Sequence, residues 1–175
     1  FVLMGQLIYQ TGLASDLYHG VRRWIGKVPG GMAITSVDAC GAFGAVTGSS
    51  IATVATMGTI VMPEMRRYNY HPRLATGALA ASGTLGILIP PSLIFIFYGV
   101  MTETSIGALF IAGIVPGILT AAMFSAIILL RCTVPPALGP PGPQASWSER
   151  WRAMVGLLPI LGLFALVIGG IYGGI

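Results

Sequence analysis

The sequence predicts an all-α integral membrane protein that contains a helical hairpin and a broken helix. Of its 175 residues, 55% are hydrophobic and only 8% are charged, and the mean hydropathy is +0.86. A soluble domain carries about 25% charged residues, and one with so few charges would expose a large apolar surface. Two short polar sequences, in residues 47–50 and 83–92, interrupt the apolar segments and predict the two breaks.

Charge and motif content exclude several function classes. The net charge of +4 comes from short basic groups at the ends of apolar segments, so nucleic-acid binding is not expected. Cys40 and Cys132 form no metal-binding pattern, and we expect two buried, inert thiols. The chain has no HExxH, P-loop or paired-carboxylate site. An intramembrane serine protease is disfavoured because His19 and His71 lie in surface segments, away from Ser49.

The first segments are predicted to be the end of a transmembrane helix (residues 1–10) and an amphipathic helix (11–28). In the second, apolar residues recur at helical spacing while charged residues take the other positions, which is typical of a helix on the membrane surface. Trp24 and Tyr18 are residue types of the membrane interface. Because the chain begins and ends inside apolar runs, we expect a piece of a longer protein.

Residues 29–66 are predicted to form a helical hairpin with the polar tip Thr47-Gly48-Ser49-Ser50. Each arm has the length of a short or marginal span, and the polar tip favours a re-entrant hairpin over two full spans. Hydroxyls and freed carbonyls at such a tip suit an alkali cation. The alternative is a connecting turn with helix-capping serines.

Residues 73–101 are predicted to form one transmembrane helix broken between Gly83 and Ser92. Pro90 and Pro91 remove two N–H donors, and non-helical backbone at membrane depth needs protein or a watery cavity to satisfy it. Secondary transporters use such breaks to hold ions or substrates, whereas the alternative is a proline kink satisfied by neighbouring helices. The two breaks together supply the candidate binding residues Gly48, Ser49, Ser50, Thr53, Gly83, Thr84, Gly86, Pro90, Pro91 and Ser92.

The remaining segments are predicted to be a transmembrane helix (105–131), a cytoplasmic Pro/Gly-rich linker (132–152) and a last transmembrane helix (153–175). Under the positive-inside rule every basic group can be cytoplasmic at once.

Two acidic residues, Asp38 and Glu64, are candidates for a role beyond solubility. Asp38 lies inside an apolar arm about two turns from the tip, where it indicates either function or a watery crevice. Glu64 is expected to form a local ion pair near Arg66 and Arg67.

Several blocks of this sequence resemble the large permease subunit of TRAP (tripartite ATP-independent periplasmic) transporters. These are the hairpin tip from Gly44 to Ala55, Met62-Pro63-Glu64-Met65 with Tyr70, the stretch from Ala80 to Ser92, and residues 98–117 with Tyr-Gly, Thr-Glu-Thr-Ser-Ile-Gly and Pro-Gly. The resemblance runs over the whole chain. Asp38 departs from the small or apolar residue expected at its position.

The resemblance implies the first of two inverted repeats of an elevator-type permease, with a last helix leading into a second repeat. It implies sodium-driven import of an organic acid, commonly a dicarboxylate, without ATP. It also implies a periplasmic substrate-binding protein and a small membrane subunit as partners, in the bacterial inner membrane. Carried over residue by residue, the tip and the break would line one sodium site and part of the substrate site, with Ser49, Ser50 and Thr84 as the expected metal ligands.

Two other functions are compatible with the same sequence features. One is a secondary anion carrier that needs no binding protein. The other is a membrane scaffold that transports nothing, in which the breaks serve packing alone. Sodium dependence and a requirement for a binding protein would separate them from the first interpretation.

Overall fold

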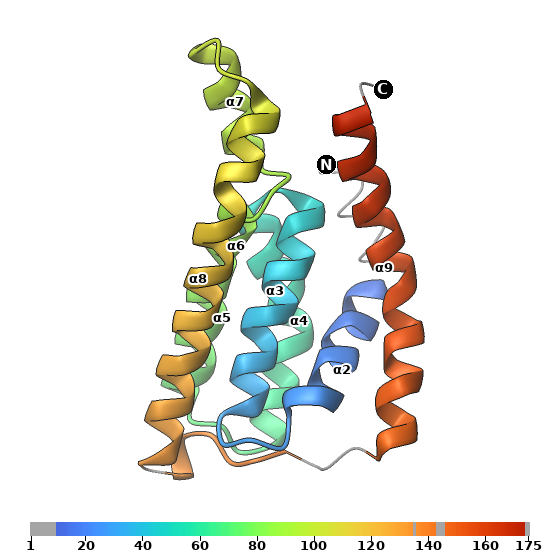
Figure 1. Cartoon of the computed structure of the whole chain (residues 1–175). Coiled ribbons are helices and arrows are strands. Elements are labelled where there is room, and N and C mark those ends of the chain that lie inside the picture. Colours follow the sequence, from blue (N-terminus) through green and yellow to red (C-terminus); the bar gives the residue numbers. More distant parts are fainter. Residues whose placement is uncertain (1–9, 135, 143–145, 174–175) are drawn as a thin grey trace.

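The computed structural model describes residues 10–134, 136–142 and 146–173, and every regular element in these ranges is helical. Its helices run as antiparallel neighbours between two ends of the molecule (Figure 1). The segment predicted as the end of a first transmembrane helix falls almost entirely outside the described residues. Within them, an all-helical fold with apolar helices compatible with membrane spans is confirmed.

Helix α2 (Leu13–Ile25) lies in the predicted amphipathic segment and runs obliquely to its neighbours. It packs against α3 (Gly31–Thr47) and the last helix, α9 (Trp147–Gly173). Trp24 is exposed, as an interface residue should be, but Tyr18 is fully buried in the core. The expectation for Tyr18 was wrong because helices cover that face of α2 as well.

The hairpin consists of α3 and α4 (Ser50–Arg67), joined by Gly48 and Ser49. Helix α4 continues through Pro63, which lies inside it. A turn at Asn69 then leads into α5 (Pro72–Gly83), with His71 as its N-cap and Pro72 at its first position, where proline is well tolerated. The Met32 N–H donates to the Tyr70 hydroxyl at 3.1 Å; burial raises the pKa of Tyr70 to about 12, so this hydroxyl stays un-ionised.

The broken helix consists of α5 (Pro72–Gly83), α6 (Leu85–Leu88) and α7 (Leu93–Met101). The two halves are bent by 40°. Gly83 is the last residue of α5, Thr84 alone separates α5 from α6, and the longer non-helical stretch is residues 89–92. The observed break is thus narrower than the predicted one, because the Thr84 backbone keeps right-handed helical angles.

Among the described residues, two helices are long and apolar enough to cross a membrane: α8 (Ile106–Thr133) and most of α9. The bent pair that includes α7 would be a third. A short 3₁₀ helix, η1 (Pro136–Leu138), follows α8. Helix α9 begins at Trp147, inside the segment predicted as a linker.

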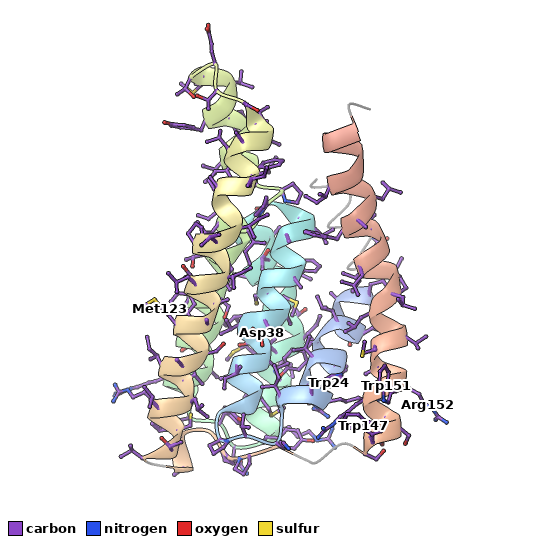
Figure 2. The ribbon with its side chains drawn as sticks, viewed as in Figure 1. Trp24, Asp38, Met123, Trp147, Trp151 and Arg152 are labelled. Atoms are coloured by element: carbon purple, nitrogen blue, oxygen red, sulfur yellow. The ribbon has the colours of Figure 1, made fainter. Side chains whose placement is uncertain are left out.

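All nine Lys and Arg residues belong to one end of the molecule. They lie at the C-terminal ends of α2, α4 and α8, at the N-terminal ends of α5 and α9, and in the α2–α3 loop. Trp24, Trp147 and Trp151 gather at this end (Figure 2). The ring centroids of Trp24 and Trp147 are 6.1 Å apart, and those of Trp147 and Trp151 are 6.3 Å apart. A basic end with a tryptophan group is typical of a membrane–water interface.

Candidate binding site at the paired breaks

The hairpin tip is built by two caps in succession. Gly48 ends α3 with φ 62°, a left-handed conformation that favours glycine, and its N–H donates to the Gly44 carbonyl at 2.7 Å. Ser49 is extended and starts α4, where its hydroxyl accepts the Ala52 N–H at 3.4 Å. The capping role that was the alternative for the serines therefore holds for Ser49.

Two buried threonines add oxygen atoms directly beneath the tip. The Thr53 hydroxyl donates to the Ser49 carbonyl at 2.7 Å. The Thr47 and Thr53 hydroxyl oxygens lie 3.0 Å apart, and both side chains are at most 1% exposed. Three oxygens from two helices and the turn between them thus lie together in the protein interior.

At the break between α6 and α7, local polar contacts also satisfy the backbone. Pro90 and Pro91 lack N–H groups, their shared peptide bond is cis, and both residues are buried. The Ser92 hydroxyl donates to the Ile87 carbonyl across the break at 2.7 Å. This bond occupies a carbonyl that the interrupted helix leaves free, as buried backbone groups require.

The structure brings the two breaks together. The Leu93 N–H donates to the Gly48 carbonyl at 3.3 Å, and a Cβ atom added to Gly48 would lie 2.9 Å from the Pro91 carbonyl oxygen. One added to Gly86 would lie 3.0 Å from the Thr53 hydroxyl and 3.2 Å from the Ser49 carbonyl oxygen. Gly48, Ser49, Thr53, Gly86 and Pro91, which come from separate helices and their connections, therefore lie together at one place in the fold.

Not every candidate occupies the centre of this site. Ser50 lies at its edge, where its hydroxyl would be 3.5 Å from a Cβ atom added to buried Gly83. Thr84 is exposed, and its hydroxyl donates to the Ala81 carbonyl of its own helix at 2.7 Å. Thr84 is therefore a poorer candidate ligand than Thr47 and Thr53.

Within the described part of the chain, the groups gathered at this site are neutral. Among the described residues, no three His, Cys, Asp or Glu side chains come close enough to hold a metal ion together. The α3 C-terminus directs carbonyl groups, and with them a partial negative charge, toward the tip. Asp38 lies well away, midway along α3 (Figure 2), and lines a cavity of about 540 Å³ between α3 and α8. The site can therefore offer neutral oxygen ligands to a cation.

Gly44 and Thr47 also lie at this site, although neither was among the binding residues predicted from the sequence. A Cβ added to Gly44 would collide with the Gly86 Cα, so α3 and α6 touch through their backbones. The spacing of Gly44 and Gly48, four residues apart, is the small-residue pattern of close helix contacts and could have signalled this.

Glu64 is ion-paired, as predicted, but its partner was assigned wrongly. It pairs with Arg22 of α2, whose guanidinium also lies 5.5 Å from the centre of the Tyr68 ring. The reason is that α2 packs on α4 and presents Arg22 to it, a contact that sequence proximity to Arg66 and Arg67 could not reveal.

Comparison with known proteins identifies the family. The family model described as "Tripartite ATP-independent periplasmic transporter, DctM component" matches residues 1–175. The chain belongs to this TRAP permease family. It is 38% identical over 175 residues to the ectoine TRAP transporter large permease protein TeaC of Halomonas elongata, covering 100% of this chain and 40% of that protein.

Other relatives carry different substrate names. The C4-dicarboxylate TRAP transporter large permease protein DctM of Pseudomonas aeruginosa is 40% identical, with 99% of this chain and 40% of that protein covered. The sialic acid TRAP transporter large permease protein SiaM of Vibrio cholerae is 31% identical, with the same shares covered. The chain thus spans about 40% of the length of these relatives. All three are named as transporter permeases, which confirms the prediction that this TRAP permease chain is not an enzyme.

Proposed function

We propose that this chain is the first-repeat portion of the large permease subunit of a sodium-driven TRAP importer of organic acids. The observation that carries the proposal is the meeting of the two breaks, which gathers buried oxygens from α3, α4 and the α6–α7 connection. In this proposal the meeting point forms part of one sodium site and borders the substrate site.

The chemistry of the donors supports a monovalent cation. Unwound backbone carbonyls and helix C-terminal ends coordinate sodium in secondary transporters, and this site presents both beside the Thr47 and Thr53 hydroxyls. The α3 C-terminus adds a partial negative charge at the tip and the α4 N-terminus a partial positive one, so the support for a cation comes from the oxygen ligands themselves. We keep Ser49 and Ser50 as ligands through carbonyl or hydroxyl oxygens, with Thr84 at the periphery.

The placement in the membrane follows from the charge distribution. We assign the basic end to the cytoplasm of the bacterial cell, with the helices in the inner membrane. The α3–α4 tip lies well short of the α7–α8 turn at the opposite end (Figure 1). In this orientation the hairpin enters and leaves the membrane from the cytoplasmic side without crossing it. The tip then lies within the bilayer, as expected for the re-entrant hairpin of an elevator-type binding domain.

The partners and substrate are proposed from the family. A small membrane subunit and a periplasmic substrate-binding protein would complete the transporter. The relatives are named for ectoine, C4-dicarboxylates and sialic acid. We therefore propose an organic acid as substrate, with a C4-dicarboxylate as the first compound to test.

The test is uptake of labelled organic acids by the complete permease and its partners in proteoliposomes, with and without a sodium gradient. Thr53→Val removes the central hydroxyl while keeping the side-chain shape. Loss of one such contact is worth about 1 kcal/mol, so the sodium concentration for half-maximal uptake should rise roughly fivefold to tenfold. The Ser49→Ala, Ser50→Ala double variant should also weaken sodium dependence.

The matched control is Thr59→Val on the same helix. Thr59 is exposed, and its hydroxyl donates to the Thr56 carbonyl of its own turn, so uptake should be unchanged. Uptake that requires neither sodium nor the binding protein would favour a different anion carrier. No uptake of any acid, with an intact complex, would favour a scaffold.

A further inference from the structure

An apolar groove lies between α3, α5 and α8, away from the paired breaks. Its volume is about 230 Å³. Its apolar lining includes Val37, Leu74, Ala78, Phe124, Ile127 and Ile128. Ile127 is 53% exposed, so the groove opens to the side of the molecule, where the outer face of α8 is apolar. In a membrane, this opening would face the acyl chains of lipids.

Two arginines are the charged members of the groove lining. Arg73 is the second residue of α5, and Arg131 lies in the last turn of α8. Both are exposed, and none of the described residues that line the groove is acidic. The two helix ends belong to the basic end of the molecule (Figure 1). The groove thus combines a cationic end at the membrane interface with an apolar body.

We propose that this groove binds an anionic phospholipid. The two guanidinium groups would hold the headgroup phosphate, since arginine matches phosphate geometry and stays charged. One acyl chain would lie along the apolar lining between α5 and α8. Basic pockets between membrane helices bind anionic headgroups in this way, and a soluble phosphate would leave the apolar groove empty. The assignment is independent of the sodium site.

The experiment measures lipid binding to the complete permease, delipidated in detergent, by native mass spectrometry and by thermal unfolding. The probes are dioleoyl phosphatidylglycerol and dioleoyl phosphatidylcholine. Each arginine near an anionic surface strengthens binding about fivefold. The Arg73→Gln, Arg131→Gln double variant should therefore bind phosphatidylglycerol more than tenfold more weakly, while its weak binding of phosphatidylcholine stays unchanged.

Two further variants keep the test specific. Arg66→Gln with Arg67→Gln removes the same charge from the same end but outside the groove lining, and should leave tight phosphatidylglycerol binding intact. Gly77→Leu keeps both arginines and fills the groove; Gly77 lines it, and no atom lies within 4 Å of a Cβ added there. This variant should also lose tight binding.

Several results would overturn the proposal. One is equal binding of the two lipids, and another is an equal loss in the Arg66, Arg67 variant, which would indicate general surface attraction. Unchanged binding in Gly77→Leu would place the lipid elsewhere. Loss of the small membrane subunit from the groove variants, with lipid binding intact, would make the groove a protein interface instead. Sodium-dependent uptake is read separately, so failure here leaves the proposed transport function untouched.

Discussion

At the scale of single residues, the site depends on glycines, because their lack of a side chain lets the helix backbones come into contact. Gly44 and Gly86 let two helices touch through their backbones, and Gly48 ends α3 in a conformation that other residues adopt at a cost. The sequence indicates glycine richness, but only the contacts show which glycines have no room for a methyl group.

We predict that Gly44→Ala destabilises the protein. The new methyl group would collide with the Gly86 backbone, and overpacking of this kind costs about 1–3 kcal/mol. The measurement is the thermal unfolding midpoint of the purified complete permease in detergent. Gly156→Ala on α9 is the control, because no atom lies within 4 Å of a Cβ added there. Equal midpoints for the two variants would show that α3 and α6 are not in backbone contact.

At the scale of secondary-structure elements, a polar contact joins α2 to the hairpin. Arg22 pairs with Glu64 of α4 and lies against the Tyr68 ring. About a fifth of each side chain in the ion pair is exposed, so water screens the attraction only in part. The pair therefore fixes how the amphipathic helix sits on the basic end of the hairpin.

A double-mutant cycle measures this pair. We expect Arg22→Gln and Glu64→Gln to show a coupling free energy of about 0.5–1 kcal/mol in thermal unfolding, as for partly screened ion pairs. The comparison cycle combines Glu64→Gln with Arg67→Gln and should show coupling near zero. Coupling only in the comparison cycle would restore the sequence-based expectation that Glu64 pairs within its own helix end.

At the scale of the whole molecule, charge and hydropathy agree on one orientation. The basic residues gather at one end, and the exposed surfaces of α8 and α9 are apolar over most of their length. A bilayer accommodates both features, since it solvates apolar helix faces and leaves the charged end in water. In the orientation that we propose, the hairpin and the broken helix lie side by side at membrane depth.

Cysteine accessibility tests this orientation. In a background with Cys40→Ala and Cys132→Ala, Thr104→Cys in the α7–α8 turn should react with a membrane-impermeant maleimide on intact spheroplasts. Ser146→Cys, just before α9, should react only after the membrane is opened. Both positions are exposed, so access to solvent alone does not separate them. The reverse pattern would invert the assigned topology.

The sequence by itself determined the membrane class, the helical segments, the two polar breaks and the charge asymmetry. These follow from local composition and spacing, which act through the chain's own neighbours and through the solvent. Gly48, Ser49 and Pro90-Pro91 could be assigned to breaks because glycine, capping serine and proline act on the backbone within a few residues.

The tertiary structure alone decided which of these features meet. It placed the Gly48 carbonyl against Leu93, buried Thr47 and Thr53 together, turned Thr84 outward, and gave Glu64 a partner in α2. It also aligned Arg73 and Arg131 along one groove. These arrangements depend on how whole helices pack against one another, and no local pattern records that packing.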